Sequence, residues 1–210
     1  MTSLIVYIQL LLAKDQNLSS EKRVQYLHQS NEQAIRMRGL IDGFLNVSQL
    51  NEGKLLLHKN TFRICTLMDY IRNIYSLKPV KHFIQYTGAT DSSQEILADR
   101  DKIEQVIINF IDNAIKYSPT NSMIIMDIAV DHNFFGVKVI DQGRGIGENH
   151  QKQIFNKFYR VNDSTDSYAS GFGIGLFICQ EIIQKHQGQI GVDSTLGEGS
   201  TFWFQIPIHS

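Results

Sequence analysis

The sequence has 210 residues, of which 42% are hydrophobic and 20% are charged, and its formal net charge is −1. This length suffices for one large or two small domains that each bury a core. A nearly neutral charge without a basic run gives no support for nucleic acid as a partner. Cys65 and Cys179 lie far apart in apolar segments, which is typical of reduced core thiols in a cytosolic protein and excludes a disulfide framework or a zinc site.

The chain opens with an apolar run, Leu4–Ala13, whose spacing is that of a helix. Gln9 interrupts the run, which is shorter than the ~18 to 20 residues that a membrane span needs. It also lacks the basic lead-in and cleavage site of a signal peptide. We therefore expect this chain to be cytoplasmic, while the full-length protein could still be anchored to a membrane.

A second amphipathic pattern runs from about Glu21 to Leu50 and, with the first helix, predicts a helical hairpin. The apolar face is broad, so we expect two copies of the chain to pair in a four-helix bundle and form a homodimer. The alternative is that both helices pack on the downstream domain. Asn51-Glu52-Gly53 ends the long helix and predicts a boundary between a domain of residues 1–53 and a domain of residues 54–210.

Beyond this boundary the elements become shorter. The patterns predict helices at Ile64–Leu77, Ile103–Tyr117 and Phe172–Lys185, and strands at Leu55–Phe62, His82–Thr87, Glu95–Ala98, Met123–Val130, Phe134–Ile140, Gln189–Ser194 and Ser200–Ile208. The expected fold is α+β: the helical hairpin, followed by a sandwich with helices on one face of a mixed, mostly antiparallel sheet.

The predicted helix Ile103–Tyr117 carries a second, polar line beside its apolar stripe. Asn109, Asn113 and Lys116 follow at i, i+4 and i+7, on one side of the helix. Asn is a poor helix former because its amide competes for backbone hydrogen bonds. The line therefore suggests that something polar is bound there; the alternative is a solvated face that tolerates two Asn residues. Asp99 or Asp101 is the expected N-cap, and the spacing of Asp101 and Glu104 is close to that of a capping box.

Two glycine clusters follow. Asp141-Gln-Gly-Arg-Gly-Ile-Gly147 stands directly after a strand, where glycine allows another molecule to approach the backbone and the carboxylate can accept a hydrogen bond from an exocyclic amine such as that of adenine. Gly171-Phe-Gly-Ile-Gly-Leu176 opens a helix, whose free N–H groups are suited to phosphate. The alternative interpretation of the first cluster is an ordinary turn. The spacing of the second cluster does not fit a dinucleotide fingerprint.

Taken in order, the motifs resemble those of a known family. Asn109…Asn113, Asp141-x-Gly-x-Gly-x-Gly, Gly171-x-Gly-Ile-Gly-Leu and Gly197-x-Gly-Ser-Thr-Phe resemble the N, G1, G2 and G3 boxes of sensor histidine kinases, and Ile154–Arg160 resembles the F box. Residues 21–54 are similar to the second helix of the dimerisation and phosphotransfer domain. The rest resembles the catalytic ATP-binding domain shared with gyrase, Hsp90 and MutL.

The resemblance implies binding of ATP and Mg²⁺. Asn113 would be the metal ligand through its amide oxygen, Asp141 would bind the adenine amine with help from Thr201, and a mobile lid would run from about Glu148 to Ser170, with Phe155 and Phe158 anchoring its base. Arg160 is a candidate phosphate contact or a partner within the lid. The residues implied in nucleotide binding are Asn109, Asn113, Lys116, Tyr117, Asp141, Gly143, Gly145, Ile146, Gly147, Tyr159, Arg160, Gly171, Gly173, Ile174, Gly175, Leu176 and Thr201.

The residue at position 109 distinguishes ATP hydrolysis from phosphoryl transfer within this superfamily. ATP hydrolases of the superfamily carry a Glu as general base where this chain has Asn109, and an amide cannot take a proton at neutral pH. The resemblance therefore favours phosphoryl transfer to a protein over hydrolysis. Serine kinases of the anti-sigma type share the boxes but lack the helical hairpin.

The acceptor motif of the family, a His followed by Glu-Leu-Arg-Thr-Pro, does not occur at any of the seven histidines. His28 lies on the second helix, where a solvated residue is expected. The chain is thus expected to be a kinase core of a two-component system that is unable to phosphorylate itself, with a response regulator as partner and a sensor domain upstream. The alternative is a catalytically silent ATP-binding module that modulates other kinases.

Overall fold

The computed structural model describes residues 2–12, 19–31, 33–34, 37, 56–79, 81–161 and 172–208. The chain divides into two compact units, Met1–Leu55 with Ser170–Phe172 and Leu56–Ala169 with Gly173–Ser210, and each is described by itself. The predictions for residues 38–55, for Gly171 and for lid residues 162–170 lie outside the described residues.

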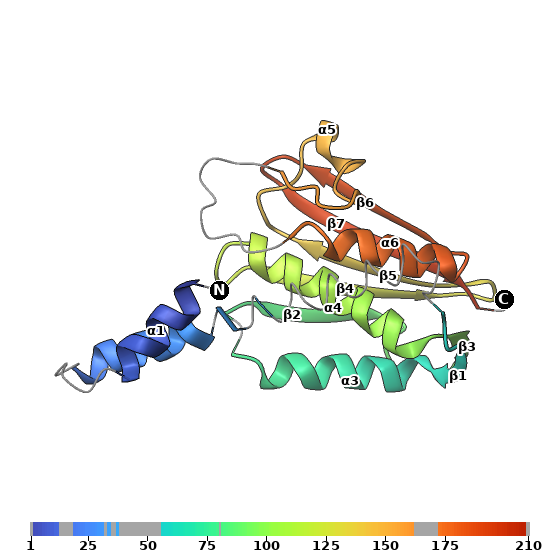
Figure 1. Cartoon of the computed structure of the whole chain (residues 1–210). Helices are drawn as coiled ribbons and strands as arrows, with labels where there is room; N and C mark the ends of the chain where they lie inside the picture. The colour runs from blue at the N-terminus through green and yellow to red at the C-terminus, as the bar shows by residue number, and fades with distance from the viewer. Residues whose placement is uncertain are drawn as a thin grey trace. The chain divides into compact units, whose positions relative to one another are not determined.

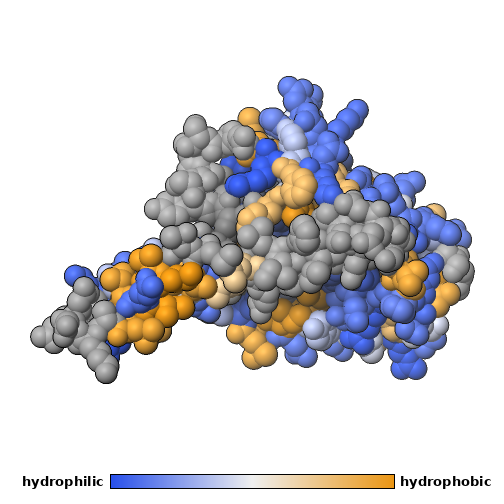
Figure 2. Space-filling view, in the orientation of Figure 1, coloured by the Kyte–Doolittle hydropathy of each residue, from blue (hydrophilic) through white to orange (hydrophobic). Residues whose placement is uncertain are grey.

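The first unit contains the expected helical hairpin. Helix α1 spans Thr2–Leu12, and residues 20–31 are again helical. The rings of Tyr7 and Tyr26 stack across the two helices with centroids 5.9 Å apart. Much of the apolar surface is exposed, and Figure 2 shows hydrophobic side chains gathered on this unit.

The second unit holds the remaining elements (Figure 1). In chain order these are β1 (Asn60–Arg63), α3 (Ile64–Leu77), β2 (Phe83–Gly88), β3 (Glu95–Ala98), α4 (Arg100–Tyr117), β4 (Met123–Val130), β5 (Phe134–Asp141), α5 (Glu148–Gln151), α6 (Gly175–Lys185), β6 (Gln189–Thr195) and β7 (Gly199–Pro207). The bounds differ from the predicted ones by a few residues, chiefly at β1 and at the start of α6. No helix in this described part of the chain, or in the described part of the hairpin, has the length and hydropathy of a membrane span.

Five strands form one sheet in the order β2-β4-β5-β7-β6, and β1 pairs with β3 in a separate two-stranded sheet. Strand β2 runs parallel to β4, and every other pairing is antiparallel. Figure 1 shows α3, α4 and α6 gathered on one face of the large sheet. The predicted α+β fold is therefore confirmed.

The core lies between this face and the helices. The apolar stripe of α4 is fully buried, and the ring of Phe110 packs on Phe202 at 5.5 Å and on Phe204 at 6.2 Å between centroids. Burying a side chain of this size stabilises the fold by about 1.5–3 kcal/mol. Because one stripe of α4 is fixed against β7, its polar line is directed to one side.

The start of α4 is held by a buried polar network. Asp99 is the N-cap: its Oδ1 accepts a hydrogen bond from the Lys102 N–H at 3.2 Å, and its Oδ2 accepts one from the His58 N–H at 2.8 Å. The Asp99 N–H in turn donates to Nε2 of His186, at the C-terminus of α6, at 3.0 Å. Glu104 does not complete a capping box, because the N-cap is Asp99 and not Asp101, so Glu104 lies two residues beyond the N3 position; its carboxylate binds Arg100 at 2.9 Å.

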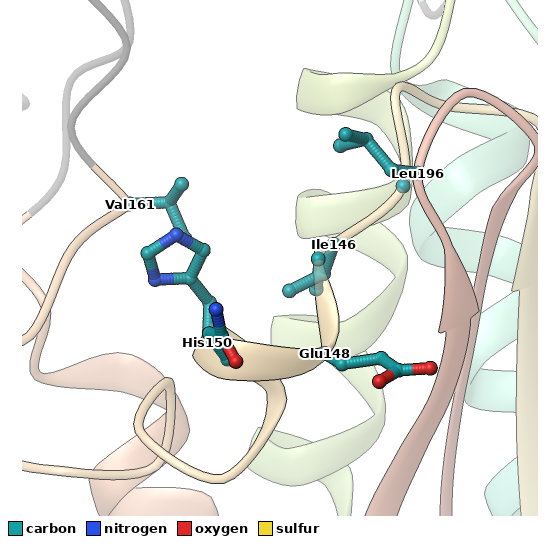
Figure 3. Close-up of a pocket in the computed structure, with 8 residues that line it drawn as sticks. Ile146, Glu148, His150, Val161 and Leu196 are labelled. Carbon is teal, nitrogen blue, oxygen red and sulfur yellow. The ribbon is translucent and has the colours of Figure 1, made fainter.

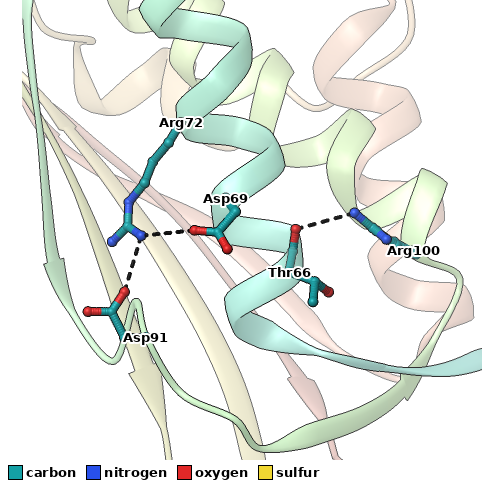
Figure 4. Close-up of polar contacts among 5 residues, drawn as sticks. All are labelled: Thr66, Asp69, Arg72, Asp91 and Arg100. Atoms are coloured by element: carbon teal, nitrogen blue, oxygen red, sulfur yellow. Dashed lines mark hydrogen bonds and ion pairs between the residues drawn. The ribbon is translucent and has the colours of Figure 1, made fainter.

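Exposed polar contacts join α3 to its neighbours (Figure 4). Arg100 Nη2 donates to the carbonyl oxygen of Thr66 at 3.3 Å, and Arg72 Nη1 lies 3.3 Å from Asp69 and 3.1 Å from Asp91. Exposed ion pairs of this kind contribute only about 0–1 kcal/mol. The Arg72–Asp91 pair links α3 to the segment before β3, and among these contacts only the Arg100–Thr66 hydrogen bond links α3 to α4. The buried core therefore supplies the stability.

Candidate functional site

The polar line of α4 forms one wall of the candidate site. Asn109 and Asn113 are half-buried, and Nδ2 of Asn113 donates to Oδ1 of Asn109 at 3.1 Å. The amide oxygen of Asn113 is therefore directed away from this bond and can serve as a ligand for a hard cation. Lys116 is exposed one turn further on, and its ammonium lies 4.7 Å from the ring centroid of Tyr117.

Tyr117, the last residue of α4, has a second cation over its ring. The guanidinium carbon of Arg144 lies 5.1 Å from the ring centroid. Two cations against one aromatic ring give this end of the site a positive potential, which favours an anionic ligand. Arg144, which stands between two of the motif glycines, was not among the predicted site residues.

Asp141 is the last residue of β5 and forms the floor of the site. It is only 6% exposed, and its Oδ1 accepts the N–H of Gly143 at 2.7 Å. Burial raises the pKa of this carboxyl, and the backbone N–H groups of Gly143 and Ser200 oppose that shift. A buried carboxylate with remaining acceptor capacity is suited to a ligand that donates hydrogen bonds.

The loop after Asp141 follows the surface of the β6–β7 turn closely. Gly145 has a φ of +69°, and a Cβ there would collide with the carbonyl oxygen of Thr195. A Cβ on Gly143 would meet the carbonyl oxygen of Tyr117 at 2.8 Å. Gly147 has no such neighbour, since the nearest atom to an added Cβ is 3.8 Å away in His150. Two of the three glycines are thus required by packing and the third is not.

The N-terminus of α6 closes the site from the other side. A Cβ on Gly175 would collide with Nδ2 of Asn109, so the helix begins directly against the polar line of α4. Ile174 is buried at the N-cap and Leu176 is half-buried. Thr201 lies on β7, paired with Ile140 in the neighbouring strand. The structure thus places Gly175 against Asn109 on α4, and places Gly143, whose N–H binds Asp141, against Tyr117 at the end of the same helix.

The F-box segment, Ile154–Arg160, belongs to the part of the predicted lid that the structure describes, and we call it the neck. Phe155 is buried, as expected for an anchor, but the side chain of Phe158 is 62% exposed. The prediction that the Phe158 ring anchors the lid is therefore wrong. Its backbone is held by pairing with the start of the next segment: Phe158 adopts a φ of 65°, and its N–H donates to the carbonyl oxygen of Gly173 at 2.8 Å.

A cavity of about 440 Å³ opens beside this neck (Figure 3). The predicted residues Gly145, Ile146 and Gly147 line it, together with His150, Val161 and Leu196, which the prediction did not include. In Figure 3 the ring of His150 is drawn next to Val161, and Ile146 lies across the opening from them. Nδ1 of His150 is hydrogen-bonded to the hydroxyl of Tyr159 at 2.6 Å, so the polar end of the Tyr159 side chain is bound to His150 in this structure. Arg160 is exposed at the same neck.

The comparison with family profiles gives one match in the second unit. Residues 98–210 match the family described as histidine kinase-, DNA gyrase B- and HSP90-like ATPase. This range contains α4, the loop after Asp141 and the N-terminus of α6.

Curated relatives extend the match toward the hairpin. The chain is 33% identical over 189 residues to the adaptive-response sensory kinase SasA of Synechocystis, covering 89% of this chain and 49% of that protein. It is 30% identical over 176 residues to the sensor protein SrrB of Staphylococcus aureus, covering 84% of this chain and 30% of the relative. The chain therefore spans half or less of these relatives.

Solved structures have the same fold. The catalytic domain of histidine kinase ThkA superposes with a TM-score of 0.61 at 26% identity, covering 72% of this chain and 97% of that domain. Full-length ShkA, solved in complex with AMPPNP, gives a TM-score of 0.72 at 23% identity and covers 98% of this chain and 42% of that one. The histidine kinase AdeS of Acinetobacter baumannii also gives 0.72, at 22% identity, with 99% and 94% covered.

Proposed function

The chain belongs to the family of histidine kinase-, DNA gyrase B- and HSP90-like ATPases and carries the ATP-binding catalytic domain of a two-component sensor histidine kinase, and from this premise we propose that it binds ATP with Mg²⁺ and transfers the γ-phosphoryl group to a histidine. The observation that supports this most directly is that the glycine-opened N-terminus of α6 lies against Asn109 of the half-buried asparagine pair, while the loop after the buried Asp141 carboxylate lies against Tyr117 at the end of the same helix. ShkA, a structural neighbour, is described in complex with an ATP analogue.

The proposed nucleotide contacts follow from the chemistry of each group. The Asp141 carboxylate accepts the exocyclic amine of adenine, and Thr201 on the neighbouring strand assists it. Lys116, Arg160 and the N-terminus of α6 contact phosphate. The glycines, Ile146, Ile174 and Leu176 shape the pocket, and Tyr117 and Tyr159 lie against the nucleotide.

The residues present fit a magnesium ion at Asn113. Its Nδ2 is engaged by Asn109 at 3.1 Å, which leaves the amide oxygen as the group available to a cation that prefers oxygen ligands. When bound, Mg²⁺ would neutralise charge on the phosphates. Asn109 cannot act as a general base, so the site positions the γ-phosphoryl group without activating water.

The acceptor is proposed to lie outside this chain. None of the seven histidines carries the acceptor motif, and we propose that the chain does not phosphorylate itself. We propose residues 1–53 as a dimerising hairpin and residues 54–210 as the catalytic domain. The imidazole acceptor would belong to a partner kinase subunit, and a response regulator would then take the phosphoryl group.

Binding is tested by calorimetry with ATP and Mg²⁺. Asn113→Ala should abolish the magnesium-dependent part of the affinity, and Asp141→Ala should lower the affinity about tenfold or more, because each removes a contact to a charged or buried group. Asn133→Ala, in the β4–β5 turn, is the matched control and should leave binding unchanged. The absence of heat from the unsubstituted chain would refute the proposal.

Transfer is tested by mixing this chain with a kinase subunit that has an acceptor histidine but a disabled ATP site. Labelled phosphate on that histidine would support the kinase. Tight ATP binding without transfer would support the alternative of a silent module. Continuous phosphate release without an acceptor would indicate a hydrolase and contradict the role proposed for Asn109.

A further inference from the structure

The backbone N–H and carbonyl groups of Ile146 are held by side chains from two other elements. Its N–H donates to Oγ of Ser194 on β6 at 2.8 Å, and its carbonyl oxygen accepts a hydrogen bond from Nε2 of Gln151, in α5, at 2.9 Å. The same Gln151 amide also donates to the carbonyl oxygen of Ser194 at 2.7 Å. We call Ser194 and Gln151 the Ile146 clamp.

The hydroxyl of Ser194 is itself oriented by the β6–β7 turn. It donates to the carbonyl oxygen of Gly199 at 2.7 Å and lies 2.9 Å from Oγ of Ser200. Because the hydroxyl proton is directed to Gly199, a lone pair of the oxygen is left to accept the Ile146 N–H. Ser194 is half-buried, so water replaces this acceptor poorly.

Elsewhere in the loop the Asp141 side chain accepts the Gly143 N–H, and backbone hydrogen bonds hold other positions. Asp141 pairs with Ser200 in the sheet, and the Gly197 N–H donates to the carbonyl oxygen of Arg144 at 2.7 Å. At Ile146 both the backbone N–H and the backbone carbonyl oxygen bind side chains. Its side chain lines the 440 Å³ cavity, whereas neither clamp residue does.

We propose that Ser194 and Gln151 are positioning residues that fix Ile146 against the base of the nucleotide and thereby set the affinity and the adenine selectivity of the site. This inference rests on the proposed function. Asp141 is held by the sheet and would contact one edge of the base, so the position of Ile146 determines how closely a planar ring can approach that carboxylate. Adenine offers an amine there, whereas guanine offers a carbonyl oxygen, which a carboxylate repels.

The test substitutes each clamp residue and measures binding of ADP and GDP with Mg²⁺ by calorimetry. Ser194→Ala and Gln151→Met should each weaken ADP about tenfold, the effect of roughly one lost hydrogen bond in a pocket, and should lower the ADP-to-GDP affinity ratio. Ser194→Thr keeps the hydroxyl and should restore both values.

The matched controls come from another Ser and Gln pair, in the segment between β2 and β3. The Gln94 N–H donates to Oγ of Ser92 at 3.2 Å, and Nε2 of Gln94 donates to the carbonyl oxygen of Asp131 at 3.3 Å. Ser92→Ala and Gln94→Met make the same side-chain changes and remove hydrogen bonds of the same types away from the candidate site, so they should leave the affinity and the selectivity unchanged.

A second readout follows the clamp directly. Hydrogen exchange of the Ile146 amide, measured by NMR without nucleotide, should accelerate about tenfold or more in Ser194→Ala and should not change in Ser92→Ala. Folded variants with unaltered exchange, or with unaltered affinity and selectivity, would overturn the inference. If the unsubstituted chain binds no ADP, the proposed function fails, and the selectivity that we infer fails with it, even where the exchange confirms the hydrogen bonds. If one variant does not fold, the other clamp variant decides by the same criteria.

Discussion

Asp141 places a carboxylate in the protein interior, where a charge does not help the chain to fold. The carboxyl is 6% exposed, and burial raises its pKa despite the N–H groups of Gly143 and Ser200. A raised pKa means that the folded state holds its proton more tightly than the unfolded chain, so ionisation of this group at neutral pH costs stability. Such a cost is typical of a residue kept for binding.

We therefore predict opposite effects of Asp141→Asn on stability and on binding. The amide removes the buried charge and can still accept the Gly143 N–H, so thermal unfolding at pH 7 should occur at a higher temperature, by about 1–4 °C. ADP affinity should fall about tenfold or more, because an amide accepts the adenine amine less strongly than a carboxylate does. Calorimetric scans and titrations check both; a lower unfolding temperature would contradict the stated cost of the charge.

At the scale of elements, the site depends on how α4 and α6 are held together. His186 is 2% exposed at the end of α6, where Nδ1 donates to the carbonyl oxygen of Ile182 at 2.8 Å and Nε2 accepts the N–H of Asp99 at 3.0 Å. These bonds require the neutral ring. Burial lowers the pKa of His186, and Lys59 adds to this shift, while the Ile182 carbonyl and the Asp99 carboxylate oppose it.

This network predicts a pH dependence. Because the pKa of His186 is lower in the folded state, the unfolded chain binds the proton first as pH falls below the ordinary value of about 6.5, and stability declines from there toward the folded pKa. His186→Gln cannot titrate, so its free energy of unfolding in urea should vary less between about pH 7 and 5. His132→Gln, at an exposed position in the β4–β5 turn, is the control. Equal slopes for His186→Gln and the unsubstituted chain would contradict the prediction.

Regular elements with strong periodicity were predictable, and loop geometry was not. The bounds of α3, β3 and β4 agree with the prediction, because alternation and helical spacing reflect which face is buried. The exposed ring of Phe158 was mispredicted, since its positive φ follows from pairing with Gly173, far away in the sequence. Arg144 and His150 were missed for the same reason: their ring contacts arise only when the loops have folded.

At the scale of the whole molecule, the hairpin exposes apolar side chains that its own two helices do not cover. Ile5 is 50% exposed and Leu12 is 73% exposed on α1, while Val24 is 66% and Leu27 is 55% exposed on the second helix. The catalytic unit, in contrast, has a continuous core of its own between the sheet and α4. Dimerisation and nucleotide binding should therefore be separable.

We predict that this chain forms dimers and that the double variant Val24→Glu, Leu27→Glu is monomeric with unchanged ADP affinity. Burying each side chain in a bundle contributes about 1.5–3 kcal/mol, so placing two charges there should weaken the dimer by a hundredfold or more. Sedimentation equilibrium measures the mass, and calorimetry measures the affinity. Leu77→Glu, 85% exposed at the end of α3, is the control and should remain dimeric. A monomeric unsubstituted chain at about 100 µM would refute pairing through the hairpin, and a loss of ADP binding in the double variant would show that the two units depend on each other.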